Sequence, residues 1–391
     1  MLFYPHLIAG FDIQTLPQQV VNGLLMGSIY ALIALGYTMV YGVLKLINFA
    51  HGEVFMLGAY GSLFTSWALG YGPNGHATHA SYLALLLMML ASMTLCGLVG
   101  VIIERFAYRP LRNQARIASL ITAIGLSLLL QYGGQVFLLN GVPQSISDDA
   151  NPFNGKKIVL NLRAADSDLL TKAATLTPKV NETVAAFQAQ LPNEKSQFDL
   201  SPKGDALQKE MQAAKREYDD AIDKANARRI AVEIPEGKLT MLVMTFVLMS
   251  ILTFLVLFTK RGRAMRAVSL DFSASALMGI NVDSIITFTF VLGSTLAGAG
   301  AMMYATLQSG TKIDPFLGMA PGLKAFVAAV LGGIGNIPGA VLGGILMGIA
   351  ENLVDWAGYD SYRDAIAFVI LIIVLLFKPG GLLGSAKVEK V

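Results

Sequence analysis

The sequence is poor in the residues on which most enzymes depend. Cys96 is the single cysteine, and the 391 residues include only four histidines. One cysteine excludes a disulfide framework and a cysteine-based metal cluster. No HExxH or CxxC motif is present, and no set of serine, histidine and acid resembles a hydrolase triad. The sequence therefore predicts a protein that is not an enzyme and that needs no cofactor or metal.

Nucleotide and nucleic-acid sites are also missing. The only Gly-Lys pairs are Gly155-Lys156 and Gly237-Lys238, and neither completes the phosphate-binding motif G-x-x-x-x-G-K-[ST]. The chain itself is therefore not expected to hydrolyse ATP. The formal net charge is only +3, and the basic residues gather in short segments, so no nucleic-acid partner is predicted. No basic region precedes the first apolar run, which argues against a cleaved signal peptide.

Charge of either sign is scarce. Charged residues make up 14% of the chain and hydrophobic residues 54%, with a mean hydropathy of +0.58, whereas an ordinary soluble protein is about 25% charged. The composition predicts an all-α, polytopic membrane protein in a lipid bilayer. A spanning helix needs about 20 mainly apolar residues, which gives about eight crossings. The candidate spans are 17–44, 48–69, 81–103, 117–139, 239–259, 284–307 and 365–377, with the glycine-rich stretch 322–353 in addition.

The basic segments predict the orientation, because lysine and arginine are retained on the cytoplasmic side. They gather in RFAYRPLRNQAR (105–116), in KRGRAMR (260–266) and in the tail, which carries Lys378, Lys387 and Lys390. All three segments are expected in the cytoplasm. Counting spans between them places the polar residues after 140 outside, and it also places the N-terminus outside.

One polar insertion, Gly141–Glu236, contains 13 Lys/Arg and 15 Asp/Glu. It separates a first group of membrane helices (1–140) from a second group (237–391). Apolar residues at three- and four-residue spacing within 163–230 predict an antiparallel hairpin of two amphipathic helices, with a kink or restart at Thr177. The hairpin is expected on the periplasmic side, where it either docks a partner or is a tolerated extension of a loop.

The stretch 322–353 is too long for one spanning helix and is interrupted in its middle by Gly332, Gly333, Gly335, Asn336 and Pro338. Irregular backbone at membrane depth is tolerated only where it packs in protein or lines a cavity, and discontinuous helices often line a transport route. Two interpretations stay open, a break in a translocation route or a tight turn between two short helices. Glycines four residues apart, such as Gly23 and Gly27 or Gly344 and Gly348, predict close helix packing.

The segment INFAHGE (47–53) places polar residues between two apolar runs. Asn48, His51 and Glu53 are costly there unless other groups satisfy them. Asn48 is a candidate N-cap for a helix that begins at Phe49, Glu53 would gain from the positive end of that helix, and His51 could share a proton or a hydrogen bond with Glu53. The segment is either a capped helix start near the cytoplasmic face or a polar constriction in a translocation route, and we favour a combination.

Several segments together resemble one family of transport proteins. They are NGLLMGSIYALIALGYTMVYGVLKLINFAHGEVFMLGAY, ERFAYRPLRNQARIASLITAIGLSLLLQ, SALMGINVDSIITFTFVLGSTLAGAGAMMY, GLKAFVAAVLGGIGNIPGAVLGG and LLFKPGGLLG. In this order they look like the LivH-type permease subunits of branched-chain amino-acid ABC importers. The resemblance implies a multi-pass subunit in the bacterial inner membrane that imports leucine, isoleucine and valine by alternating access. It also implies a LivM-like second permease, two ATP-binding cassette ATPase subunits and a periplasmic substrate-binding protein, but it does not extend to the insertion.

The segment SLDFSASALMGINVD follows the basic residues 260–266 and is therefore expected at the cytoplasmic face. Asp271 or Ser269 can cap a short helix over 274–278, and Gly279 with Asn281 can end it. The resemblance implies that this helix docks in a groove of the ATPase. The residues expected to couple are Asp271, Phe272, Ser273, Ala274, Ala276, Leu277, Met278, Gly279, Ile280 and Asn281. The alternative is an amphipathic loop on the lipid headgroups.

Two other functions stay open. Related permeases carry urea or short amides, and an apolar lining would suit other small solutes. A self-sufficient secondary carrier or channel would normally need buried charged groups in several spans, and the sequence is interpreted as offering them only around His51 and Glu53.

Overall fold

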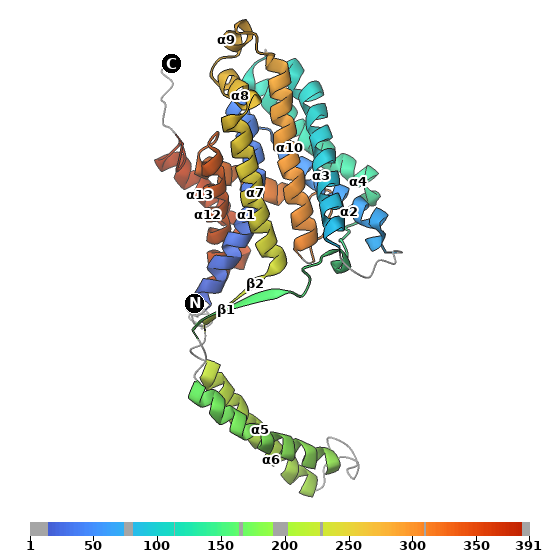
Figure 1. The fold of residues 1–391 in the computed structure, drawn as a ribbon, viewed down its shortest axis with the longest axis vertical. Helices are drawn as coiled ribbons and strands as arrows, with labels where there is room; N and C mark the ends of the chain where they lie inside the picture. The colour runs from blue at the N-terminus through green and yellow to red at the C-terminus, as the bar shows by residue number, and fades with distance from the viewer. Residues whose placement is uncertain are drawn as a thin grey trace, which may run out of the picture. The chain divides into compact units, whose positions relative to one another are not determined.

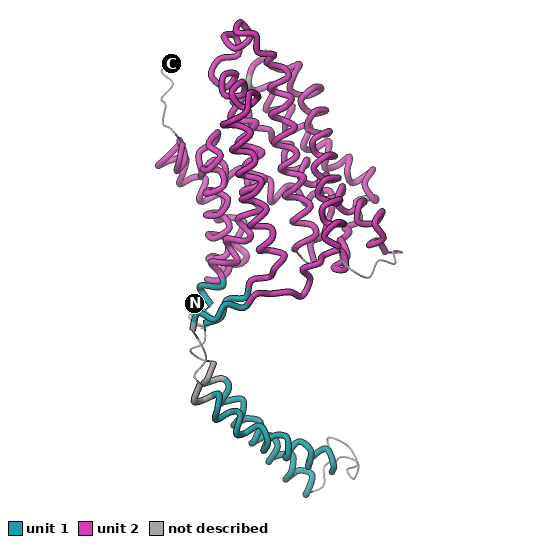
Figure 2. The backbone as a smooth tube through the Cα atoms, in the orientation of Figure 1, with its two compact units in different colours: residues 1–18, 159–233 teal, residues 19–158, 234–391 magenta. Residues whose placement is uncertain are grey.

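The computed structural model describes residues 15–73, 81–112, 114–163, 167–190, 202–226, 230–308 and 310–384 (Figure 1). The chain divides into two compact units, one of residues 1–18 and 159–233 and the other of residues 19–158 and 234–391 (Figure 2). The two hairpin helices are expected to be joined by PNEKSQFDLSPKG (192–204); residues 192–201 of this link lie outside the described residues, as do Lys387 and Lys390.

The larger unit is a helical bundle. Its helices are α1 (Leu16–Leu44), α2 (His51–Ser66), α3 (Tyr82–Ile103), α4 (Arg116–Phe137), α7 (Glu236–Phe258), α8 (Lys260–Leu270), α9 (Phe272–Leu277), α10 (Val282–Leu307), α11 (Met319–Gly332), α12 (Ile337–Trp356) and α13 (Arg363–Phe377). Within the described residues, six of these are long and apolar enough to cross a membrane, namely α1, α3, α4, α7, α10 and α12. The expected spans 48–69 and 365–377 and the first part of 322–353 correspond to the shorter helices α2, α13 and α11, which are not among these six. The architecture confirms an all-α polytopic membrane protein.

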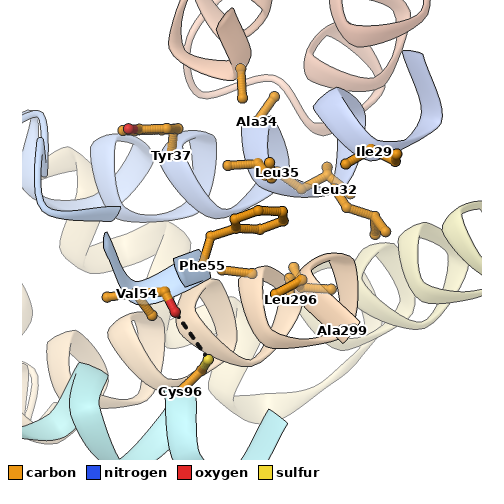
Figure 3. Close-up of a cluster of buried hydrophobic side chains, with 14 of the residues drawn as sticks. Ile29, Leu32, Ala34, Leu35, Tyr37, Val54, Phe55, Cys96, Leu296 and Ala299 are labelled. Atoms are coloured by element: carbon orange, nitrogen blue, oxygen red, sulfur yellow. Dashed lines mark hydrogen bonds between the residues drawn. The ribbon is translucent and has the colours of Figure 1, made fainter. Parts of the chain in front are cut away.

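Helices α1 and α10 lie at the centre of the bundle. In their most apolar windows 89% and 72% of the residues are buried, against 22% in α4 and α7. Figure 3 shows the core that α1, α2 and α10 share, with Leu32 and Leu35 of α1 near Phe55 of α2. The Cys96 thiol of α3 donates a hydrogen bond to the Val54 carbonyl at 3.2 Å. The peripheral helices therefore present their apolar side chains outward, as a lipid-facing surface requires.

The glycine stripes bring α1 against α12, which confirms their predicted role in packing. A Cβ atom added to Gly27 would lie 2.7 Å from the Gly344 carbonyl oxygen. One added to Gly23 would lie 2.5 Å from the Ile349 Cα. Only glycine permits backbones to approach this closely, so α1 and α12 depend on these residues for their contact.

The smaller unit contains the predicted helical hairpin. Helix α5 (Ser167–Gln190) packs along α6 (Pro202–Asn226), and Ala173 and Ala214 are buried between them. A two-stranded sheet of β1 (Lys157–Arg163) and β2 (Ile230–Pro235), which the sequence analysis did not predict, joins the ends of the insertion. Helix α5 does not restart at Thr177, because it continues through Pro178 as one helix.

Candidate functional site

The turn before α2 carries the polar segment singled out from the sequence, but its contacts differ from the prediction. Helix α2 begins at His51, and its N-cap residue is Ala50, which makes no side-chain cap. The Asn48 Oδ1 atom instead accepts a hydrogen bond from the Tyr108 hydroxyl at 3.0 Å. The prediction that Asn48 caps a helix from Phe49 is therefore wrong, because the chain first makes a turn and the amide accepts from Tyr108, in the helical turn Glu104–Tyr108 after α3.

His51 and Glu53 point away from each other, so the predicted hydrogen bond between them is also wrong. Residues two apart on an α-helix lie roughly 200° apart around its axis. The His51 ring packs edge-on against Tyr37 of α1, with 4.8 Å between ring centroids. Gly36 makes room for it, since a Cβ there would lie 2.1 Å from the His51 Nε2 atom. Glu53 faces α4, where Gln131 Nε2 donates to its Oε1 atom at 2.6 Å.

Glu53 lines a small cavity, which we call the Glu53 cavity. Its volume is about 230 Å³, and α1, α2, α4 and α11 form its walls. Glu53 is 3% exposed, and its Oε2 atom has no hydrogen-bond partner among the described residues. The wall of the cavity therefore contains a buried carboxylate, and its Oε2 atom is shielded from solvent in this structure. The apolar part of the wall includes Phe49, Leu128, Leu323 and Phe326.

Helix α11 begins beside the start of α2, and glycines allow this contact. A Cβ atom added to Gly318 would lie 1.9 Å from the Gly52 carbonyl oxygen, and one added to Gly322 would lie 2.8 Å from the Gly52 Cα. The first turns of α11 are thus held against the residue that precedes Glu53. This contact fixes the wall that α11 contributes to the Glu53 cavity.

The glycine-rich break joins α11 to α12 and packs on the C-terminal segment 380–384. Gly333 and Gly335 adopt φ angles of +104° and +96°, and the Asn336 side chain caps α12 by accepting from the Gly339 N–H at 3.0 Å. Asn336 Nδ2 also donates to the Leu383 carbonyl at 2.8 Å, and the Leu383 N–H donates to the Gly332 carbonyl at 3.0 Å. Pro338 fits the first turn of α12, where no helical hydrogen bond is lost. These contacts favour the interpretation of the break as a tight turn between two helices. None of the residues of the break lines the Glu53 cavity.

A cluster of buried charges joins α11, α12 and α13. Glu351 is fully buried, and it forms ion pairs with Lys324 at 2.9 Å and with Arg363 at 3.4 Å. The Tyr30 hydroxyl donates to Glu351 Oε2 at 2.8 Å. The interpretation that buried charges occur only around His51 is therefore wrong. The sequence did contain a signal, since Lys324 and Glu351 are isolated charges within apolar runs.

The end of the bundle beyond α8 carries the short helix α9, and Figure 1 shows it at the tip of that end. Asp271 caps α9 as predicted, because its Oδ1 atom accepts from the Ala274 N–H at 2.9 Å. Gly279 ends it with a φ angle of +82°. Asn281 does not end α9, contrary to the prediction, since its side chain caps α10. The side chains of Leu277 and Met278 are 88% and 83% exposed, so the tip of α9 is an exposed apolar surface.

A set of ion pairs joins residues 104–112, which follow α3, to the first turn of α10. Arg112 pairs with both Glu104 and Asp283, and Arg109 also pairs with Asp283. The Thr287 hydroxyl donates to Glu104 Oε2 at 2.8 Å. We call these residues the Arg112 cluster. They are charged groups with direct partners, and no group of described His, Cys, Asp or Glu residues is placed to hold a metal ion.

Comparisons with known proteins match the sequence to a family of transport proteins. Residues 19–375 match the family described as "Branched-chain amino acid transport system / permease component". The chain belongs to this permease family.

Full-length relatives of the permease carry the same description. It is 34% identical over 376 residues to the high-affinity branched-chain amino acid transport system permease protein LivH of Escherichia coli strain K12, covering 96% of this chain and 97% of LivH. It is 37% identical over 374 residues to the corresponding protein BraD of Pseudomonas aeruginosa, with the same coverage of 96% and 97%. A shorter match, 35% over 127 residues, covers 30% of this chain and 39% of the ribose import permease protein RbsC of Escherichia coli strain K12. No solved structure matches the chain.

Within the permease, the residues predicted from the sequence fall into three separate places. Asn48, His51 and Glu53 surround the start of α2, but only Glu53 lines the cavity there. The glycine break lies at the far end of α11, and the residues around α9 lie at the tip of the bundle beyond α8. The structure adds Gln131, Lys324 and Glu351, which come from helices far apart in the sequence.

Proposed function

We propose that this permease is the translocation subunit of an ATP-driven importer of branched-chain amino acids in the bacterial inner membrane. One observation carries the proposal. Relatives that match 96% of the chain are named as permeases for branched-chain amino acids. The chain has no nucleotide-binding motif, so separate ATPase subunits would hydrolyse ATP.

The orientation follows from the basic residues at one end of the bundle. Helix α8 carries Lys260, Arg261, Arg263 and Arg266, and α9 lies directly after it. Basic residues of this kind are retained in the cytoplasm, so α9 would be cytoplasmic and the insertion 141–236 periplasmic. The exposed Leu277 and Met278 would enter a groove on one of two ATPase subunits, while a LivM-like permease would complete the pathway and a periplasmic binding protein would deliver the solute.

The Glu53 cavity is our candidate for part of the route. Pockets for drug-sized ligands measure about 300–1,000 Å³, so a cavity of about 230 Å³ suits a solute of few atoms. An amino acid's ammonium group could donate to Glu53 Oε2, while a branched side chain would lie against Phe49 and Phe326. His51 and Asn48 would act indirectly by holding the start of α2. Alternating access would then require α11 to move against α2, with the glycine break as its fixed far end.

A permease for urea or a short amide is the alternative. The small size of the Glu53 cavity and the amide of Gln131 would also suit such a solute. The partial match to a ribose permease shows that likeness over part of the chain does not identify the solute. A self-sufficient carrier is a further alternative, because buried charged groups such as Lys324, Glu351 and Arg363 can also serve ion coupling.

The test measures ATP hydrolysis by the complete importer in nanodiscs. The chain is assembled with its second permease and ATPases, and the binding protein is loaded in turn with leucine, valine, urea or acetamide. Leucine and valine should stimulate hydrolysis, whereas urea and acetamide should not. Stimulation by urea or acetamide alone would establish the alternative. Solute uptake by the chain alone, without ATP, would overturn both.

A further inference from the structure

A second cavity opens at the end of the bundle opposite α9. Its volume is about 360 Å³, and residues of α1, α7, α10, α11, α12 and α13 line it. We call it the Lys238 cavity, after a residue in the first turn of α7. Helix α11 contributes Ala320, Pro321 and Lys324 to this cavity, and Met319, Gly322, Leu323 and Phe326 to the Glu53 cavity. The first turns of α11 therefore separate the two cavities.

Charged side chains of both signs surround the Lys238 cavity. Lys238, Lys324 and Arg363 supply three positive charges, and Glu351, Asp364 and Asp355, which interacts with Arg363, supply three negative ones. Lys324 pairs with Glu351 at 2.9 Å and with Asp364 at 2.7 Å, and Arg363 pairs with Glu351 at 3.4 Å. Among the residues that the structure describes, Lys238 has no carboxylate partner. Lys238 is therefore the one of these three basic residues that forms no direct ion pair within the described part of the chain.

The surroundings strengthen the effect of the Lys238 charge. Glu351 is fully buried, and the Lys324 side chain is only 11% exposed, so water screens the cluster weakly. Helix α11 begins at the cavity wall, and the N-terminal end of a helix carries a partial positive charge. Short helices that begin inside a membrane protein often direct this end toward an anionic group of a solute. A solute that carries a negative charge is therefore the one that fits.

We propose that the Lys238 cavity binds the carboxylate group of the transported amino acid, with Lys238 as its counter-ion. The proposal rests on the proposed function for the identity of the solute. Asp364 also lines the cavity, and its side chain is 75% exposed, so it is accessible to the ammonium group of the same solute. Met26 provides apolar surface for a branched side chain. The cavity thus matches all three parts of an α-amino acid.

The test measures the charge of the cavity with the full-length chain in nanodiscs. A Gln308→Cys variant in a Cys96→Ala background places one accessible thiol on the cavity wall, since Gln308 lines the cavity and Cys96 is buried. The thiol is treated with an anionic or a cationic methanethiosulfonate reagent of similar size. We expect the anionic reagent to react faster, and we expect Lys238→Gln to lower the ratio of the two rates about tenfold.

The matched control is Lys312→Gln. Lys312 is an exposed lysine in the loop after α10, and it does not line the cavity. This variant should leave the ratio of rates unchanged. An equal ratio in wild type and Lys238→Gln would overturn the inference, as would an equal loss in both variants.

Protection by solutes tests the carboxylate directly. Millimolar leucine should slow the anionic reagent, whereas isoamylamine, which has the same side chain but no carboxylate, should not. Equal protection by the two would overturn the inference. A purely structural role for Lys238 would change folding without changing protection in the folded protein.

Leucine uptake by the complete importer separates this inference from the proposed function. If the wild type takes up no branched-chain amino acid but Lys238→Gln still lowers the ratio of rates, the proposed function fails and the anion preference stands. If the wild type takes up leucine and Lys238→Gln changes neither uptake nor the ratio, the inference fails and the proposed function stands.

Discussion

Glu53 is a buried carboxylate with one oxygen paired and one shielded without a partner. Gln131 donates to its Oε1 atom, and its Oε2 atom has no hydrogen-bond partner among the described residues. Leaving a buried polar atom unpaired is costly. An unpaired carboxylate oxygen in a cavity wall lowers the protein's free energy of unfolding, and such a position suits a residue that binds a solute. A solute that donates a hydrogen bond to this oxygen would remove the penalty while it is bound.

Glu53→Gln should slow transport without disturbing assembly. The amide keeps the shape of the side chain and can still accept from Gln131, but the charge is lost. A hydrogen bond to a charged group is worth about 1.5–3 kcal/mol, so uptake at limiting leucine should fall about tenfold or more. Uptake and the size-exclusion profile of the complex are measured together. Normal uptake in both Glu53→Gln and His51→Ala would remove this segment from the route, and failed assembly would assign it a structural role.

Gly318→Ala should destabilise the permease, because the new methyl group would overlap the Gly52 carbonyl at 1.9 Å. Overpacking of this kind costs about 1–3 kcal/mol, and the midpoint of thermal unfolding in detergent should fall. Gly125→Ala is the matched control, since no atom lies within 4 Å of a Cβ added there. It should unfold at the wild-type temperature or slightly above. Equal midpoints for the two variants would show that α2 and α11 do not need their close contact.

The sequence alone identified the polar residues before and in α2 as candidates, but it did not predict which side chains they contact. Asn48, His51 and Glu53 stood out because they are polar within apolar runs. The bonds that they form depend on Tyr108, Tyr37 and Gln131, which come from three other elements of the chain. The capping prediction failed for Asn48 because a local rule cannot account for a hydroxyl that tertiary packing brings to the same amide.

Among the elements, α9 and the Arg112 cluster form a connected end of the bundle. Helix α9 ends at Leu277, and α10 begins at Val282, whose next residue Asp283 pairs with Arg112 and Arg109. Force applied to α9 would therefore reach the residues that follow α3 as well as α10. This arrangement suits an element that passes movement from an ATPase to the membrane helices.

Arg112→Gln should destabilise this end strongly, whereas Arg109→Gln should not. Glu104 is 1% exposed, and without Arg112 its charge would be buried with only the Thr287 hydroxyl as a neutral partner. Breaking a buried ion pair from one side costs about 3–5 kcal/mol. Arg109 and Asp283 are both more than 40% exposed, and a pair of that kind is worth about 0–1 kcal/mol. Thermal unfolding of the two variants should therefore differ clearly, and equal midpoints would contradict the cluster's role.

Ala276→Arg should prevent association with the ATPase while the permease still inserts. The substitution adds bulk and charge to an exposed helix beside Leu277, and loss of a central contact residue typically costs about 2 kcal/mol or more. Ala174→Arg, the same change on an exposed position of α5, is the control. Association and stimulated ATP hydrolysis are measured in nanodiscs. Wild-type values in Ala276→Arg would show that α9 is not the coupling element.

The positions of the helices could be predicted more completely than their ends. Long apolar runs are sufficient to place α1, α3, α4, α7 and α10, because a bilayer requires their length and composition. Asp271 could be recognised as a cap from its type and position. Asn281 was assigned to the wrong helix, since a residue between two helices can end one or begin the next. The strands β1 and β2 were missed because each pairs only with a segment more than 60 residues away.

On the scale of the whole molecule, the membrane bundle and the hairpin are separate compact units. The hairpin buries its own apolar strip, with Ala173 and Ala221 among its buried residues. It therefore does not need the bundle to cover its apolar side chains. Its charge and amphipathic pattern made it recognisable in the sequence.

Opposite sides of the membrane are expected for the hairpin and α9. Single thiols introduced by Ala174→Cys and by Ala276→Cys, each in a Cys96→Ala background, are treated with an impermeant maleimide in spheroplasts. The thiol on α5 should react at once, and the thiol on α9 should react only after the membrane is permeabilised. The reverse pattern would contradict the proposed orientation.

Helix α11 gives the two cavities a common wall. Because α11 contributes residues to both walls, a shift of this helix would change the size of both cavities. Any ligand that holds α11 in one position therefore changes the affinity of the other cavity, and thermodynamics requires the effect to be reciprocal. If that effect is negative, a solute bound in one cavity would prevent a second solute from binding in the other. Each cycle of the ATPase would therefore move one molecule.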